Sequence, residues 1–275
     1  MDNRPIGVFD SGVGGLTSVR ELHRILPGED IVYFGDTGRV PYGSRSKTTI
    51  KKYAKQDINY LRTFNVKAIL AACGTVSSNL SDKDVEELAL DIPFMGVVMP
   101  ATRAACALSQ EGRIGVMATT STIRSGAYGK ALRSIQPTAR LIGNAAPLLV
   151  PLVENGLTDM ENPVTRLMLQ QYLEPFIREE VDTLILGCTH YPVLYDMIND
   201  MLGYRVNLVD SGAAAAREMQ VMLCEQGLQA NREQGTTVYR VTDTVDNFTA
   251  VAGNFLFKDI EASTEYVDVD IVASL

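Results

Sequence analysis

The stretch VKAILAACGTVSSN, residues 66–79, decides the fold because it is a buried strand that breaks into small and polar residues. Its first half is almost continuously apolar, which is typical of a strand covered on both faces. Its second half places Cys73 beside glycine, threonine and serine. A second stretch, VDTLILGCTHYPVL at 181–194, has the same order and places Cys188 beside Thr189 and His190. A strand that ends in a thiol therefore occurs twice in this chain.

Short apolar runs alternate with amphipathic segments along the rest of the sequence. IGVFD at 6–10 leads into a glycine turn and then into apolar residues at helical spacing as far as Leu26. DIVYFGD at 30–36 reads as a second strand. Strands that alternate with helices predict an α/β fold with mainly parallel sheets. We further expect a loop over 37–46, helices over 48–64 and 81–90, and a strand over 92–98.

The second part of the chain repeats the first. RIGVMATTSTIRSGAYGKALRSIQP at 113–137 has the order of 5–27: an Ile-Gly-Val strand, a small-residue turn, a helix and a proline. Ile114 lies 108 positions after Ile6, and Cys188 lies 115 positions after Cys73. Any two α/β units look somewhat alike, but the cysteine at the same place in both favours an internal duplication. We predict two similar α/β domains, pseudo-symmetric about an active site between them.

The repeat also suggests where the domains divide. We place 1–98 together with 209–275 in the first domain, and 99–208 in the second. The stretch 206–223 predicts a strand and a helix, and the tail predicts a strand, a helix and a strand over 260–271. We assign the tail to the first domain because the sheet of that domain needs further strands.

Composition and charge exclude several classes of function. The chain has 275 residues, 46% of them hydrophobic, and a net charge of −8, which disfavours nucleic acid and anionic membranes as main partners. No apolar run approaches the roughly 18 residues of a membrane span, and the N-terminus has no signal-peptide pattern, so we expect a cytoplasmic protein. The four cysteines are far apart and form no zinc pattern with the two histidines, so we expect no metal.

Two thiols at equivalent strand ends suit one kind of reaction. Ligands of open α/β sheets bind at the carboxyl ends of strands, so pseudo-symmetry would place Cys73 and Cys188 on opposite sides of one small site. Two opposed bases can remove a proton from one face of a carbon and return one to the other face, which is racemisation. Asp10 could relay protons with Cys73, or simply cap the following helix. His190 could assist Cys188.

In the segments that carry this pattern, the chain resembles the cofactor-independent glutamate racemases of bacterial peptidoglycan synthesis. The matching segments lie in the family's order over nearly the whole chain. They are GVFDSGVGGLT (7–17), YFGDTGRVPYG (33–43), ACGTVSS (72–78), GVMATTSTIRSGAY (115–128), PLLVPLVENG (147–156), LILGCTHYPVL (184–194) and VDSGAAAA (209–216).

The resemblance implies roles for named residues. It makes Cys73 and Cys188 the two catalytic acid/base residues, with Asp10, Glu154 and His190 as their assistants. It implies L- and D-glutamate as substrates, a homodimer, and neither pyridoxal phosphate nor a metal. The residues that the resemblance places around the amino acid are Asp10, Ser11, Pro41, Tyr42, Gly43, Gly74, Thr75, Thr119, Thr122, Thr189 and His190.

One departure from the family keeps alternatives open. Asn is usual where this chain has Gly74, so a side-chain amide that would hold substrate is absent. A racemase of another amino acid such as aspartate, or a non-catalytic amino-acid-binding protein, therefore stays possible. Glu154 could be a solvated loop charge, and Asp36 could hold its own loop rather than touch substrate. For Cys106 and Cys224 we expect only packing roles.

Overall fold

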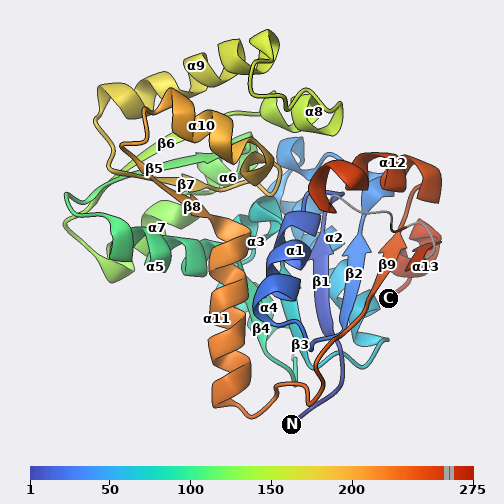
Figure 1. Ribbon diagram of the computed structural model, residues 1–275. Coiled ribbons are helices and arrows are strands. Elements are labelled where there is room, and N and C mark those ends of the chain that lie inside the picture. Colours follow the sequence, from blue (N-terminus) through green and yellow to red (C-terminus); the bar gives the residue numbers. More distant parts are fainter. Residues whose placement is uncertain (89, 257–259, 261–262) are drawn as a thin grey trace.

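The computed structural model describes residues 1–275 except 89, 257–259 and 261–262, and it contains two parallel β-sheets, one in each half of the molecule (Figure 1). The first sheet has the order β10-β9-β2-β1-β3-β4 and the second has the order β6-β5-β7-β8. Every strand pair in both sheets is parallel, as the alternation of strands and helices predicted.

The strand bounds follow the apolar runs of the sequence. The first sheet consists of β1 (Ile6–Asp10), β2 (Ile31–Gly35), β3 (Ala68–Ala71), β4 (Phe94–Gly96), β9 (Thr237–Val241) and β10 (Thr264–Tyr266). The second consists of β5 (Arg113–Ala118), β6 (Arg140–Ala145), β7 (Thr183–Leu186) and β8 (Asn207–Asp210).

The two sheets share one topology. The order β2-β1-β3-β4 in the first sheet corresponds strand for strand to β6-β5-β7-β8 in the second. Cys73 follows β3 and Cys188 follows β7, so the two cysteines occupy equivalent places in the two halves. This correspondence fits the internal duplication that the sequence predicts.

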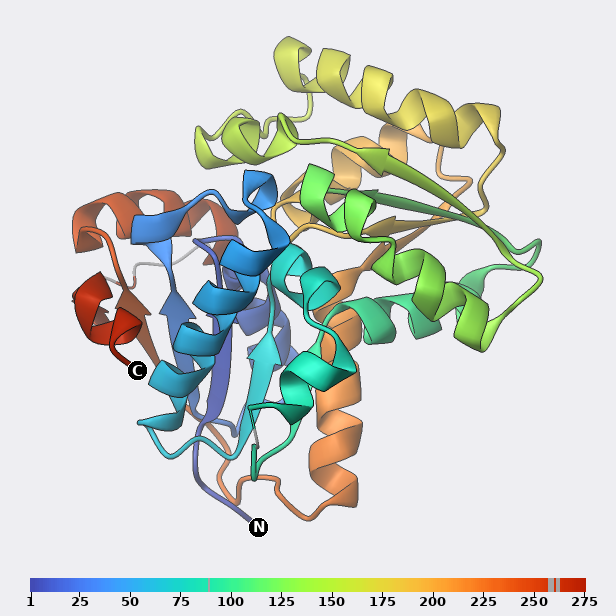
Figure 2. The same cartoon turned by 180° about the vertical axis from the view of Figure 1, so that it is seen from behind.

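Helices cover both faces of each sheet, as Figures 1 and 2 show from opposite sides. Around the first sheet lie α1 (Leu16–Ile25), α2 (Lys47–Arg62), α3 (Gly74–Asn79), α4 (Asp82–Glu86), α11 (Ser211–Glu225), α12 (Val245–Leu256) and α13 (Val269–Ala273). Around the second lie α5 (Val98–Leu108), α6 (Thr120–Ser125), α7 (Ala127–Ile135), α8 (Leu149–Glu154), α9 (Pro163–Arg178) and α10 (Tyr195–Met201). Short 3₁₀ turns in the described residues include η1 (Thr37–Arg39), η2 (Tyr42–Ser44) and η3 (Tyr191–Leu194).

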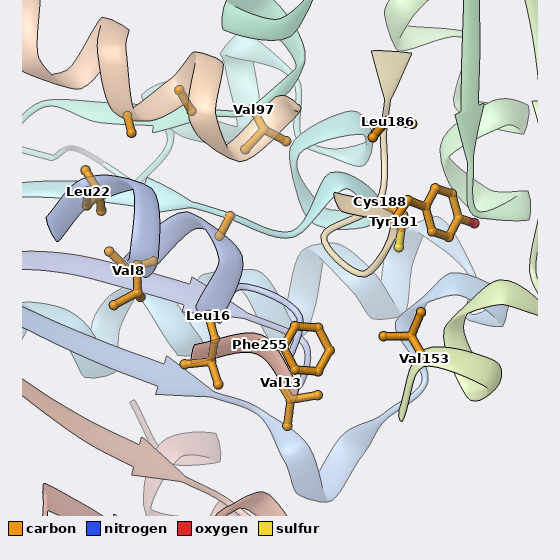
Figure 3. Close-up of a cluster of buried hydrophobic side chains, with 14 of the residues drawn as sticks. Val8, Val13, Leu16, Leu22, Val97, Val153, Leu186, Cys188, Tyr191 and Phe255 are labelled. Carbon is orange, nitrogen blue, oxygen red and sulfur yellow. The ribbon is translucent and has the colours of Figure 1, made fainter. Parts of the chain in front are cut away.

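The central strand β1 shows how the core is built. All five of its residues are buried, and their side chains alternate between the two faces of the sheet. Ile6 and Val8 join a cluster that continues into the second domain, whereas Phe9 packs on the opposite face with residues of α2. Figure 3 shows part of the continuous cluster, in which Cys188 lies next to Tyr191. The thiol at the end of β7 therefore sits at the edge of a core shared by both domains.

Helix α11 connects the two halves (Figure 1, orange). It begins directly after β8, where the side chain of Asp210 caps it by accepting hydrogen bonds from the backbone of Gly212 and Ala213. It packs on α1 of the first domain and on α5 of the second. The last strand of one sheet is thereby fixed to the other domain.

The structure differs from the sequence-based expectation at several places. Residues 74–79, expected as a turn, form helix α3, since the backbone of Cys73 accepts a hydrogen bond from that of Ser77. The expected strand 92–98 is shorter, because α5 already begins at Val98. The edge strand β6 was not predicted. Residues 209 and 210, assigned above to the first domain, belong to β8 and so to the second sheet.

Two expected elements include residues outside the described part of the chain. The helix expected over 81–90 contains residue 89, and its described part is α4, which a capping box from Ser81 and Asp84 begins. The strand expected over 260–271 contains 261–262, and β10 occupies only 264–266 of its described residues. The prediction is wrong for 269–271, which begin helix α13, because the side chain of Asp268 caps a helix there by accepting a hydrogen bond from the backbone N–H of Asp270. None of the helices in the described ranges is both long enough and apolar enough to cross a membrane.

Candidate active site

A cavity of about 860 Å³ lies where the carboxyl ends of the strands of the two sheets face each other. Its wall contains both Cys73 and Cys188, together with side chains from the turns after β1, β3, β5 and β7. Parallel strands bring their carboxyl ends to one edge of each sheet, and residues from both edges line this one cavity. The topology thus places the two thiols on one cavity.

Cys73 is the N-cap residue of α3 and is 5% exposed. Its sulfur donates a hydrogen bond to the hydroxyl oxygen of Ser11 at 3.5 Å. Burial, and then the nearby carboxylate of Asp10, raise the pKa of Cys73 to about 12. This cysteine is therefore a neutral thiol at neutral pH.

Asp10 ends β1 and organises the glycine turn that follows it. Its Oδ2 accepts hydrogen bonds from the backbone N–H groups of Gly12 and Gly15, each at 3.1 Å. The N-cap residue of α1 is Gly15, so Asp10 holds the turn and does not itself cap the helix. Asp10 is 1% exposed, and its Oδ1 has no hydrogen-bond partner within the described residues. One carboxylate oxygen is thus committed to the turn, while the second remains buried close to Cys73.

Cys188 has a different neighbourhood. Its sulfur lies 3.8 Å from Nδ1 of His190, and Nε2 of the same ring lies 2.9 Å from Oε1 of Glu154, at the end of α8. Burial alone lowers the pKa of His190, but the hydrogen bonds with Cys188 and Glu154 outweigh it and raise the pKa to about 10. The imidazole is therefore a cation at neutral pH, and a cation beside a sulfur stabilises negative charge on it.

The two sides of the cavity are therefore electrostatically unequal. A buried carboxylate stands behind Cys73 and keeps that thiol protonated, whereas an imidazolium stands beside Cys188. One side can give a proton and the other can take one. An acid and a base on opposite walls of one cavity are what proton transfer through a bound carbon acid requires.

Hydroxyl groups from the two domains meet beside the thiols. The side-chain oxygens of Thr75 and Thr119 lie 2.9 Å apart, and Thr119 in turn donates to the hydroxyl of Thr122 at 3.0 Å. Thr119 is the N-cap residue of α6, where its oxygen accepts from the backbone of Thr122. Such hydroxyls and the backbone N–H groups of the turns suit a carboxylate ligand.

A buried polar network holds the loop after β2. Tyr42 donates through its hydroxyl to Asp36, and to Asp57 of α2 at 3.2 Å. The guanidinium of Arg39 lies 2.6 Å from Asp36 and 2.9 Å from Asp57. Both carboxylates are fully buried, and burial and then the neighbouring Asp36 raise the pKa of Asp57 well above its usual range. The network fixes the loop that brings Tyr42 and Gly43 to the cavity, and Asp36 acts within it without lining the cavity.

Most residues singled out in the sequence lie in the cavity wall. Asp10 and Thr122 do not line it and lie behind the lining residues. The singled-out residues in the wall are Ser11, Pro41, Tyr42, Gly43, Cys73, Gly74, Thr75, Thr119, Glu154, Cys188, Thr189 and His190.

Sequence reasoning missed a group of basic residues at the cavity. Arg45, Lys47 and Arg124 line it, are exposed, and form no ion pair within the described ranges. All three lie in or just after segments that carried the resemblance, so a count of charges near those segments could have found them. Asn79 and Ser121 also line the cavity and were missed; the amide of Asn79 donates to Ser121 at 3.1 Å.

The other two cysteines lie apart from the site. Cys106 is partly buried on α5, and Cys224 is exposed on α11, so the expected packing role of Cys224 is wrong. No group of three or more His, Cys, Asp or Glu side chains among the described residues is arranged to hold a metal ion.

Comparison with known families gives a match over most of the chain. A family model described as Asp/Glu/hydantoin racemase matches residues 6–219. The glutamate racemase of Chlorobaculum tepidum is 42% identical over 269 residues, which are 98% of this chain and 96% of that protein.

Solved structures of glutamate racemases share the fold of this chain. A glutamate racemase isoform from Bacillus anthracis superposes with a TM-score of 0.92 at 36% identity, covering 98% of this chain and 99% of the other. The glutamate racemase of Francisella tularensis, solved in complex with D-glutamate, superposes with a TM-score of 0.89 at 36% identity, covering 98% and 100% of the two chains.

Proposed function

Because the chain belongs to the Asp/Glu/hydantoin racemase family, we propose that it is an isomerase that interconverts L- and D-glutamate with two thiols as acid and base. The observation that carries the mechanism is the placement of Cys73 and Cys188, each at the end of an equivalent strand, on one cavity between two similar domains. Opposed thiols offer each face of a bound Cα its own proton-transfer group.

The proton inventory of one turnover balances. The Cys188 thiolate takes the Cα proton from one face, which breaks a C–H bond and forms an S–H bond. The Cys73 thiol then gives its proton to the opposite face, which breaks an S–H bond and forms a C–H bond. The negative charge has moved from one sulfur to the other, and the enzyme in this state is ready for the opposite enantiomer. No redox step or covalent intermediate is needed.

The neighbours of each thiol set these roles. His190, held by Glu154, stabilises the thiolate form of Cys188 and the charge that returns to it in the reverse direction. Asp10 and Ser11 stand beside Cys73, where the carboxylate favours the protonated form before the reaction and the hydroxyl steadies the thiolate after it. These assistants lower the difference in energy between the two charge arrangements, which is what reversible racemisation demands.

The substrate is held by groups that suit its charges. We assign the carboxylates of glutamate to the turn N–H groups and to the hydroxyls of Ser11, Thr75, Thr119 and Thr189. Gly43 and Tyr42, fixed by the Asp36 network, close the cavity from the side of the loop. Gly74 brings no side chain to the site, so the backbone and these hydroxyls carry the recognition.

The biological setting is also a proposal and rests on the resemblance to the family. The product D-glutamate would serve peptidoglycan synthesis and so the maintenance of cell shape. The enzyme would work in the cytoplasm as a homodimer, without pyridoxal phosphate or metal. Of the two alternatives, racemisation of aspartate shares the mechanism, whereas a purely binding protein would not need both thiols.

Circular dichroism of the substrate tests this proposal in one assay. Purified, dialysed enzyme with L-glutamate should lose ellipticity until the signal reaches zero, and D-glutamate should approach the same end point from the opposite sign. The same assay on L-aspartate should give a much lower kcat/KM. Faster conversion of aspartate would reassign the substrate, and no conversion of either amino acid would favour the binding protein.

A further inference from the structure

We infer that Gly74 is a positioning residue that sets the separation of the two thiols, because it is where the backbones of the two cysteine turns touch. This inference rests on the proposed two-thiol mechanism. A Cβ atom placed on Gly74 would come within 3.0 Å of the carbonyl oxygen of Gly187, a separation that real Cβ atoms essentially never show. It would also lie 3.3 Å from the carbonyl carbon of Gly187 and 4.0 Å from Cα of Cys188.

The contact involves the direct neighbours of both thiols. Gly74 follows Cys73 in the first domain, and Gly187 precedes Cys188 in the second. Any change in the distance between Gly74 and Gly187 therefore changes the distance between the two cysteines. No side-chain rotation can absorb it, because the atoms in contact belong to the backbone.

The Gly187 turn has no room to retreat. Its N–H donates to the carbonyl of Met117 at 2.8 Å, which ties it to β5. Directly behind it, a Cβ on Gly187 would already meet Cβ of Ala118 at 3.1 Å and the carbonyl oxygen of Met117 at 3.2 Å. The far side of the same turn is fixed by the hydroxyl of Thr17, which donates to the carbonyl of Thr189 at 3.1 Å. A methyl group on Gly74 must therefore push the two domains apart.

Separation of the domains slows the delivery of a proton to the opposite face more than it slows the removal of the Cα proton. A substrate held against one thiol can still lose its proton to that thiol. Delivery of a proton to the opposite face needs the second thiol at close range, and about 1 Å of misplacement can cost about 100-fold in rate. Gly74 adopts no left-handed backbone conformation, so the backbone angles at this position accommodate alanine.

The test compares Gly74→Ala with wild type in deuterated water, starting from L-glutamate. We expect kcat for racemisation to fall about 100-fold. We also expect the ratio of Cα deuterium in recovered L-glutamate to deuterium in D-glutamate to rise several-fold, because carbanions are reprotonated on the face from which they came. This ratio does not depend on the fraction of folded enzyme, so it separates positioning from stability.

The matched control is Gly253→Ala on α12, where an added Cβ meets nothing within 4 Å. It should keep the wild-type rate and label ratio. A Gly74→Ala enzyme with an unchanged label ratio, or one that cannot fold while the control folds, would overturn the inference. An inactive wild type would instead overturn the proposed function on which it rests.

Discussion

At the scale of single residues, the hydrogen bond between Glu154 and His190 helps to set the pH up to which the imidazole keeps its positive charge. The pKa of His190 is raised to about 10, so the cation beside Cys188 is present below that pH and is lost as pH rises through it. Glu154 is one of the two groups whose hydrogen bonds raise this pKa. It is also the group that a conservative substitution can neutralise without touching the thiols.

Glu154→Gln should therefore narrow the pH range of activity from the alkaline side. The amide cannot stabilise the imidazolium by charge, so the pKa of His190 falls and the alkaline limb of the kcat/KM profile moves to lower pH. We expect activity near neutrality to drop about tenfold. This is less than the roughly 100- to 10,000-fold contribution of a group that transfers the proton itself, because Glu154 acts through His190. The measurement is kcat/KM against pH, with Glu161→Gln, an exposed carboxylate on the same connection, as control. An unshifted alkaline limb would contradict this role for Glu154.

Some site residues could be identified from the sequence, whereas the role of another could not. Cys73, Cys188 and His190 could be singled out because cysteine and histidine in small, polar turns are unusual for structural residues. Gly74 could be recognised only as an absent side chain. The carbonyl of Gly187, 113 positions further along the chain, decides what that absence means, and backbone contacts between distant turns leave no trace in composition or spacing. With this contact in place, an asparagine at 74 cannot simply restore the missing amide.

At the scale of elements, the loop between β2 and α2 depends on one cation. Arg39 is the guanidinium between the buried carboxylates of Asp36 and Asp57, and it also donates to Gln56. Removing the cation takes the ion-pair partner away from both buried carboxyl groups. The loop ends in Tyr42 and Gly43, so damage here reaches the cavity.

Arg39→Met should destabilise the protein by about 3–5 kcal/mol, the usual cost of leaving buried charges unpaired. We expect a lower midpoint of chemical denaturation and a higher KM for glutamate, since the loop that closes the cavity loses its anchor. Arg62→Met, at the exposed end of α2, should change neither quantity. A normal KM in the Arg39→Met enzyme would show that the loop is positioned by something other than this network.

Element bounds were predictable where the apolar pattern was strong. β1 was located from the sequence because five buried residues stand before a glycine turn. Helix α3 was not, because glycine, serine and asparagine are weak helix formers and the helix depends on tertiary packing. The Arg39–Asp57 pairing was likewise hidden, since it joins a loop to the following helix across a spacing without periodicity.

At the scale of the whole molecule, the charge at the cavity mouth is opposite in sign to the net charge of the chain. The chain carries −8 overall, yet Arg45, Lys47 and Arg124 line the mouth of the cavity without ion-pair partners in the described ranges. Glutamate carries a net negative charge at neutral pH. A local positive field raises the concentration of an anionic substrate at the mouth, and salt screens it within about 10 Å at 0.1 M ionic strength.

Neutralising all three residues with glutamine should lower kcat/KM for glutamate about tenfold at low ionic strength, at the low end of such steering effects. The difference from wild type should shrink as salt is added. The control changes three exposed basic residues outside the cavity, Lys52, Lys55 and Arg133, and so removes the same charge. Equal losses in both triple variants would assign the effect to net charge and not to the mouth.

The duplicated architecture was predictable for a physical reason. Two copies of one strand–turn–helix pattern must bury similar faces, so a parallel α/β unit in one half implies the same unit in the other. The strand order of the two sheets agrees with this. How closely the halves approach was not predictable, because contacts such as Thr75 to Thr119 depend on the packing of α11 between the domains.

The central claim is that each thiol serves one face of the substrate. The most direct test measures exchange of the Cα proton with deuterated water in Cys73→Ala and in Cys188→Ala, with each enantiomer of glutamate supplied separately. We predict that both variants lose racemisation by several orders of magnitude. Each should still exchange the Cα proton of one enantiomer, and the two variants should exchange opposite enantiomers. Racemisation at the wild-type rate in either variant, or exchange of the same enantiomer by both, would contradict the account.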